Sequence, residues 1–120
     1  MVAYRFYPRA DAAQDKIWRD TVERWDEKQA VSYITGLHIH LQRLCEDKAI
    51  WRKLPQRLAV PADIKREAYF SRYEHHYIFF RELDNGDLGV MSILHERTDV
   101  PVRLAEDLAA ISEKAEQSKT

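Results

Sequence analysis

The chain has 120 residues with 45% hydrophobic content, which is the size of one domain with a single hydrophobic core. Lys and Arg number 19 against 20 Asp and Glu, and this near balance excludes the strongly basic class of nucleic-acid-binding proteins. Because the chain lacks an apolar run that could span a bilayer and its start lacks a secretory signal pattern, we expect a cytoplasmic protein that does not contact membranes.

Two helices are predicted in the first half of the chain. Residues 2–7 alternate in the manner of a short strand, and apolar residues then recur at helical spacing over 9–26, with Trp25 in the apolar stripe. A second helical pattern covers 30–45 and follows closely enough that the two helices should form an antiparallel hairpin. Cys45, the single cysteine, falls in the apolar stripe of this second pattern, so we expect it to be buried rather than reactive.

The segment 49–63 contains two prolines and has no clean periodicity. We expect an irregular connector whose apolar side chains pack it down, namely Trp51, Leu54 and Leu58. Connectors of this length without secondary structure are uncommon, which makes Trp51 and the neighbouring Arg52 candidates for contact with a partner. Alternation then predicts a strand over 64–73.

A β-hairpin is predicted over 73–99, where two apolar runs flank Asn85-Gly86. This dipeptide favours a type I′ turn with two loop residues. The register then pairs His76 with His95, Ile78 with Ile93 and Phe80 with Met91. One sheet face would therefore carry Phe80, Met91, Ile78, Ile93, His76, His95, Glu74 and Arg97, and the opposite face would carry Arg81, Leu88 and Val90.

A third helix is predicted after Arg97. Asp99 is placed to cap it, Pro101 suits its first turn, and its apolar stripe comprises Leu104, Leu108, Ile111 and Ala115. The tail from about residue 116 is polar and should fray. The order β-α-α-β-β-β-α predicts one α+β domain over residues 1–120, with a two-helix hairpin packed on a small, mainly antiparallel four-stranded sheet.

This order, together with the segments HYIFFREL and SILHERTDVPVRL around the Asn-Gly turn, resembles the ParE branch of the ParE/RelE toxin superfamily. The resemblance runs from the first strand to about Leu108. It implies the toxin of a type II toxin–antitoxin module, also called a plasmid stabilisation protein, held inactive in a hetero-oligomer by a cognate ParD-like antitoxin. ParE-type members act on DNA gyrase and trap it on cleaved DNA, whereas RelE-type members cut mRNA on the ribosome.

These two activities make different demands on the end of the hairpin. An mRNA endonuclease needs a base, an acid and cations on one surface, and the candidates are His95, Arg97, Glu74 and His76. A simpler interpretation is a Glu74–Arg97 ion pair with the two histidines as a polar rim. The near-neutral charge, the acidic helix after Arg97 and the placement of Arg81 on the other face all favour the simpler interpretation.

We therefore predict a non-enzymatic inhibitor of DNA gyrase, with a RelE-type mRNA endonuclease as the alternative and a non-toxic protein-interaction module of the same fold as a second alternative. No cofactor, metal or sequence-specific nucleic-acid contact is expected. His75 and His76, as neighbours in a strand, would point to opposite faces and could not share an ion. The candidate partner-binding residues are Trp51, Arg52, Arg81, His95 and Arg97.

Overall fold

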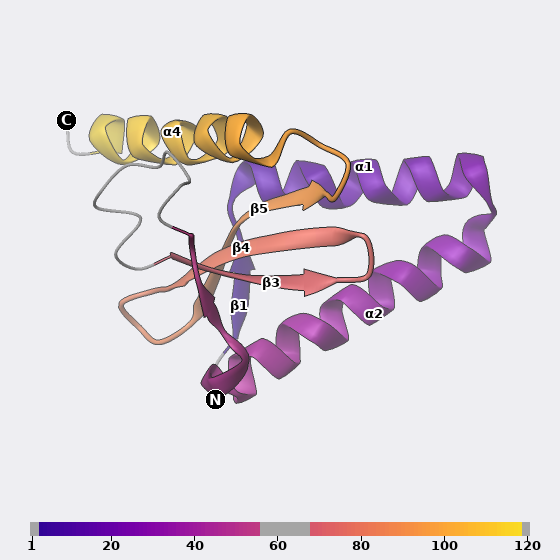
Figure 1. The fold of residues 1–120 in the computed structure, drawn as a ribbon, viewed down its shortest axis with the longest axis horizontal. Helices are drawn as coiled ribbons and strands as arrows, with labels where there is room; N and C mark the ends of the chain where they lie inside the picture. The colour runs from indigo at the N-terminus through magenta and orange to yellow at the C-terminus, as the bar shows by residue number, and fades with distance from the viewer. Residues whose placement is uncertain (1–2, 56–67, 119–120) are drawn as a thin grey trace.

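The computed structural model describes residues 3–55 and 68–118 (Figure 1). In chain order the elements are β1 (Tyr4–Phe6), α1 (Pro8–Arg24), α2 (Glu27–Glu46), the 3-10 helix η1 (Lys48–Ile50), β2 (Arg52–Lys53), β3 (Ala68–Tyr73), β4 (His76–Glu82), β5 (Leu88–His95) and α4 (Val100–Ser118). Within the described residues, no helix is both long enough and apolar enough to cross a membrane.

The α+β class and the mainly antiparallel sheet are confirmed. The strand order is β1-β5-β4-β3-β2, with β1 parallel to β5 and the other pairs antiparallel. The sheet has five strands rather than four, because the first part of the expected irregular connector forms η1 and the short edge strand β2. Leu58 and the predicted start of a strand at residue 64 lie outside the described residues.

The sheet is covered by helices on both faces. Leu37, Leu41 and Leu44 of α2 pack with strand residues on one face, including Ile78, Phe80, Val90 and Ile93. On the other face, α4 contributes Leu104 and Leu108 to a second cluster with Phe79, Met91 and Leu94. Each helix therefore presents a leucine stripe to the sheet, as the 3.6-residue period requires.

The helix ends follow from local sequence. Pro8 occupies the first turn of α1, where a missing N–H costs nothing. The Asp26 carboxylate caps α2 by accepting the N–H of Gln29 at 2.7 Å. Asp99 accepts the N–H of Val102 at 3.5 Å, which confirms it as the cap of α4. That helix continues to Ser118, past the point where fraying was expected to begin.

The turn between β4 and β5 differs from the predicted type I′ turn. The N–H of Leu83 donates to the carbonyl of Asp87 at 2.7 Å, and the N–H of Gly86 donates to the carbonyl of Leu83 at 2.9 Å. Gly86 has a φ of 89°, whereas Asn85 is not in the positive-φ region. This is a three-residue loop with its glycine in the left-handed region.

The longer loop shifts the register near the turn, so Phe80 pairs with Val90 and not with Met91 as predicted. A one-residue bulge at Met91 then restores the register, and the predicted pairs of His76 with His95 and Ile78 with Ile93 are confirmed. The predicted faces of Leu88, Val90 and Met91, which lie between the turn and the bulge, were therefore wrong. Met91 packs in the α4 cluster, and Val90 packs with Phe80 on the α2 face.

Cys45 and Trp25 were both expected to be buried, and the structure confirms this for only one of them. Cys45 is 7% exposed, and burial raises the pKa of its thiol, so the buried placement is confirmed. Trp25 is 71% exposed, so its expected place in the core was wrong. Figure 1 shows the reason, because the turn between α1 and α2 lies beyond the ends of the strands. The apolar stripe of α1 extends past the surface that could bury it.

Candidate functional site

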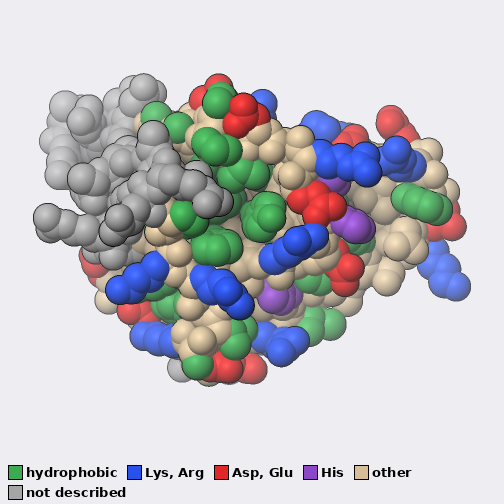
Figure 2. All heavy atoms as spheres, in the orientation of Figure 1, with side chains coloured by type: hydrophobic (Ala, Val, Ile, Leu, Met, Phe, Trp, Pro, Cys, Tyr) green, Lys and Arg blue, Asp and Glu red, His purple; other side chains and the backbone are tan. Residues whose placement is uncertain are grey.

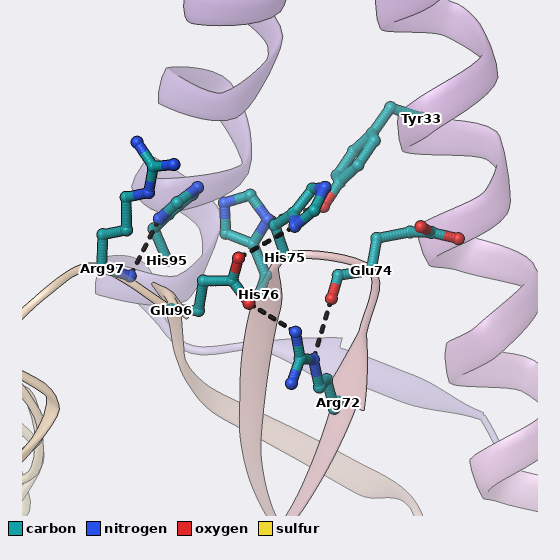
Figure 3. Close-up of polar contacts among 8 residues, drawn as sticks. All are labelled: Tyr33, Arg72, Glu74, His75, His76, His95, Glu96 and Arg97. Atoms are coloured by element: carbon teal, nitrogen blue, oxygen red, sulfur yellow. Dashed lines mark hydrogen bonds and ion pairs between the residues drawn. The ribbon is translucent and has the colours of Figure 1, made fainter.

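Polar side chains gather where the β3–β4 turn and the segment after β5 meet α2 (Figure 3). The turn residues are Glu74 and His75, and the chain leaves the sheet after His95. We call the following six residues the ionisable cluster: Arg72, His75, His76, His95, Glu96 and Arg97. The confirmed register of His76 with His95 is what brings the two hairpin ends together.

His76 is held between the sheet and α2. Its Nδ1 lies 2.6 Å from the Tyr33 hydroxyl, which belongs to α2. Burial lowers the pKa of His76 to about 4, and the neighbouring His95 and His75 add to the effect. Burial raises the pKa of Tyr33 to about 12. Both side chains are therefore neutral near pH 7, and their hydrogen bond ties β4 to α2.

His95 has a defined tautomer. Its Nδ1 accepts the backbone N–H of Arg97 at 3.0 Å, so in the neutral ring the proton resides on Nε2. The ring stands at 89° to that of His76 with 5.0 Å between centroids, and it stacks at 6.3 Å on the ring of His75. Three histidine rings thus form one contiguous group.

Glu96 supplies the negative charge of the cluster, although it was not among the site residues predicted from the sequence. The carboxylate forms an ion pair with the Arg72 guanidinium and lies 3.0 Å from Nδ1 of His75. The hydrogen bond with His75 lowers the pKa of Glu96, with a further lowering from the charge of Arg72. Strand alternation would have placed Glu96 on the face opposite His95. The strand ends at His95, however, so alternation no longer governs the next residue.

Glu74 is not part of this group. It has a φ of 50°, and Figure 3 shows its carboxylate directed away from the histidines. Its backbone carbonyl accepts the Arg72 Nε–H at 3.0 Å. The expected ion pair between Glu74 and Arg97 was therefore wrong, because the turn directs the Glu74 side chain away and the carboxylate of the cluster is that of Glu96, which pairs with Arg72 and His75 instead of Arg97.

The other candidate partner-binding residues lie apart from the cluster. Trp51 is half-buried, packs on Phe80 with 5.2 Å between ring centroids and donates its indole N–H to the Leu44 carbonyl at 2.7 Å. Arg52 is exposed on the edge strand β2. Arg81 lies on the α4 face of the sheet, where its Nε–H donates to the Tyr7 hydroxyl at 2.9 Å. Contact of these residues with a partner stays a prediction.

The chemistry open to the cluster is limited by its internal bonds. His76 is occupied by Tyr33, one nitrogen of His95 is occupied by a backbone N–H, and Glu96 is occupied by two cations. Within the described residues, no carboxylate is hydrogen-bonded to His76 or His95, and no group of His, Cys, Asp and Glu is arranged to hold a metal ion. Arg72 and His75 are exposed but bonded to Glu96, so the polar groups that stay available to a partner are mainly the exposed guanidinium of Arg97 and Nε2 of the half-buried His95.

Comparison with known proteins gives consistent matches. Residues 4–100 match the family described as the ParE toxin of the type II toxin–antitoxin system parDE. Toxin ParE of Escherichia coli is 32% identical over 108 residues, which cover 90% of this chain and 98% of that protein. Toxin ParE1 of Mycobacterium tuberculosis (strain CDC 1551 / Oshkosh) is 30% identical over 97 residues, which cover 81% of this chain and 92% of that protein.

One solved structure has the same fold. It is titled "Chromosomal ParDE TA system from P. aeruginosa" and superposes with a TM-score of 0.60 at 13% sequence identity. The superposition covers 79% of this chain and 96% of the solved one. At this identity the likeness concerns the fold alone.

Proposed function

The chain belongs to the ParE toxin family of type II toxin–antitoxin systems, and we propose that it arrests growth by binding DNA gyrase and trapping it on cleaved DNA. A cognate ParD-like antitoxin would neutralise it in a cytoplasmic hetero-oligomer. The antitoxin part of the proposal is supported by the solved ParDE system, whose title pairs a toxin of this fold with its antitoxin.

The observation that favours protein contact over RNA cleavage is the internal bonding of the ionisable cluster. RNA cleavage needs a base and an acid placed on either side of a phosphate. Here His76 is buried against Tyr33, and the Glu96 carboxylate is shared by Arg72 and His75. Glu74, the other candidate acid, turns away. These bonds support a recognition surface rather than a nuclease site.

Expression of the chain in a bacterium tests the toxin proposal. We expect growth arrest that is relieved by co-expression of the antitoxin encoded beside it. Plasmid isolated from arrested cells should be cleaved or less supercoiled, while mRNA ends mapped in the same cells should be unchanged. New mRNA ends at translating ribosomes, with normal plasmid topology, would instead support the RelE-type alternative. Absence of growth arrest would leave the non-toxic interaction module.

The exposed end of the ionisable cluster is the part that we expect to contact the target. The double variant His95→Ala/Arg97→Ala removes the two side chains of the cluster that do not bond to Glu96 or Tyr33, while the Tyr33–His76 and Arg72–Glu96 contacts remain. Interface cations that contact a partner contribute on the order of 1–2 kcal/mol each, so we expect growth arrest to need at least about tenfold more inducer. Lys28→Ala, an exposed substitution at the start of α2, is the matched control. Equal toxicity of the double variant and the control would contradict this assignment.

A further inference from the structure

A long groove lies between α1 and the ionisable cluster, and the proposed function does not account for its composition. Its α1 wall runs from Arg9 to Trp25, which at about 1.5 Å per residue is about 24 Å of helix. We call this the α1 groove. With a volume of about 1190 Å³ and an open side, it is larger and less enclosed than the pockets that hold small molecules. Its shape suits an elongated ligand.

The α1 groove carries surplus positive charge even though the whole chain is nearly neutral. Its lining holds three acidic side chains, Asp20, Glu74 and Asp107, against six basic ones, Arg9, Lys16, Arg19, Arg24, Arg97 and Arg103. Two of the acids are already paired, Asp107 with Arg9 at 3.2 Å and Asp20 with Lys16 at 2.7 Å.

Three arginines in this groove have no acidic partner among the described residues. In the part of the chain that the structure describes, Arg19, Arg24 and Arg97 form no ion pair. Figure 2 shows Lys and Arg side chains gathered over the α1 end of the visible face, with histidine beside them. An elongated ligand in the groove should therefore be an anion with several charges.

Trp25 provides a second, independent feature of the same groove. It lines one end and is 71% exposed, although an indole ring normally gains from burial. The ring follows Arg24 directly in the chain. Exposed aromatic rings beside basic side chains are what proteins use to bind single strands, because the phosphates follow the charges and the bases stack on the rings.

We propose that the α1 groove binds a single nucleic-acid strand without sequence preference, with phosphates along Arg19, Arg24 and Arg97 and a base stacked on Trp25. An acidic protein segment is the competing occupant, because it would satisfy the charges and tryptophan is also enriched in protein interfaces. A sequence-independent contact of this kind is compatible with the absence of any base-reading pattern in the sequence. It is also independent of whether gyrase is the target.

The geometry sets two measurable quantities. A strand that keeps the stacked rise of about 3.4 Å per nucleotide would place about seven nucleotides in a groove of about 24 Å. Three arginine–phosphate contacts should give a slope near −2 for the logarithm of the affinity against the logarithm of salt concentration, because each contact with a single strand contributes about −0.7.

Fluorescence anisotropy of a labelled twelve-nucleotide dT strand, titrated with the full chain at low salt, tests the proposal. Trp25→Ala and Arg24→Gln should each weaken binding by about fivefold or more. Both residues are exposed, so neither change threatens folding. Ile39→Ala, at an apolar side chain that is 58% exposed on α2, is the control for Trp25. Lys28→Gln, an exposed cation outside the groove, is the control for Arg24.

A lower affinity in the groove variants but not in the controls supports the proposal. An equal affinity for an rU strand supports it too, because DNA and RNA share phosphates and base faces. Binding that is absent at low salt, or that all four variants reduce equally, would overturn it. Displacement of the strand by polyglutamate together with no effect of Trp25→Ala would also overturn it, in favour of an acidic protein segment. The assay contains no gyrase, so its outcome and that of the proposed function are separable.

Discussion

At the scale of single residues, His76 is the group whose ionisation the fold changes most clearly. Its pKa falls from 6.5 to about 4, so between these values the unfolded chain binds a proton that the folded chain does not. Stability contributed by the neutral ring is therefore complete above pH 6.5 and is lost as the pH falls toward 4. Because the ring is partly open to solvent, we expect a loss on the order of 1–2 kcal/mol.

Urea unfolding at pH 7 and pH 4.5 measures this loss. His76→Gln removes the titrating group and keeps a polar partner for Tyr33, so the variant should lose less stability between these pH values than the unaltered protein. Burial also lowers the pKa values of His38 and His40, but both histidines are present in both proteins and cancel in the comparison. Identical losses in the two proteins would show that His76 is not the group responsible.

The residues of the site were only partly predictable from the sequence. Alternation within regular strands correctly placed His76 beside His95 and Arg81 on the other face. It failed at Glu74 and Glu96, which lie just outside the strands, because a turn can direct a side chain to either face. Tyr33 comes from a helix that is distant in sequence, and a pairing of that kind depends on how α2 crosses the sheet rather than on any local pattern.

At the scale of elements, α2 and β3 meet through a glycine. A methyl group at Gly36 would lie 2.1 Å from the Tyr73 hydroxyl oxygen. That hydroxyl donates to the Tyr33 carbonyl at 3.1 Å, and its ring packs on Tyr33 and His40. Gly36 therefore allows the tyrosine to approach the helix backbone, and the same helix carries the residue that binds His76.

Gly36→Ala should accordingly destabilise the protein. The added methyl displaces Tyr73, at a cost of about 1–3 kcal/mol, and this outweighs the gain of up to about 1 kcal/mol in helix propensity. In a Tyr73→Phe background the oxygen is gone, so the same substitution should cost much less or become favourable. Chemical denaturation of the four proteins of this double-mutant cycle gives the coupling. Equal effects of Gly36→Ala in both backgrounds would contradict the close approach.

The β4–β5 hairpin shows how far local signals determine an element. Apolar runs on both sides of Asn85-Gly86 correctly predicted two strands and a turn. The loop is one residue longer than predicted, and the bulge at Met91 was not predicted. These two one-residue errors cancel, so the pairs from Ile78–Ile93 to His76–His95 are as predicted. The bulge puts the consecutive residues Met91 and Ser92 on the α4 face, where Met91 packs in the α4 cluster and the Ser92 hydroxyl donates to Asp107 at 2.6 Å. Its position is therefore determined by the two helical layers, which the local sequence does not contain.

At the scale of the whole molecule, the sheet is covered by α1 and α2 on one face and by α4 on the other, and the groups of functional interest lie at one end of it. The class and the order of the helices and of four of the five strands followed from the sequence, because the helices have apolar stripes and two apolar runs flank the Asn-Gly turn, whereas the short charged strand β2 has no such pattern. The exposure of Trp25 did not follow, since a helical stripe does not reveal where the sheet beneath it ends. The part of α1 that extends past the sheet also forms the open end of the α1 groove.

The most direct test of the proposed function uses purified gyrase, ATP and plasmid. Addition of the chain should abolish supercoiling and accumulate cleaved plasmid, and prior incubation with its antitoxin should restore normal supercoiling. The double variant His95→Ala/Arg97→Ala should be less inhibitory than Lys28→Ala. Normal supercoiling at every concentration of the chain, with mRNA cleaved when the same preparation is added to translating ribosomes, would contradict inhibition of gyrase.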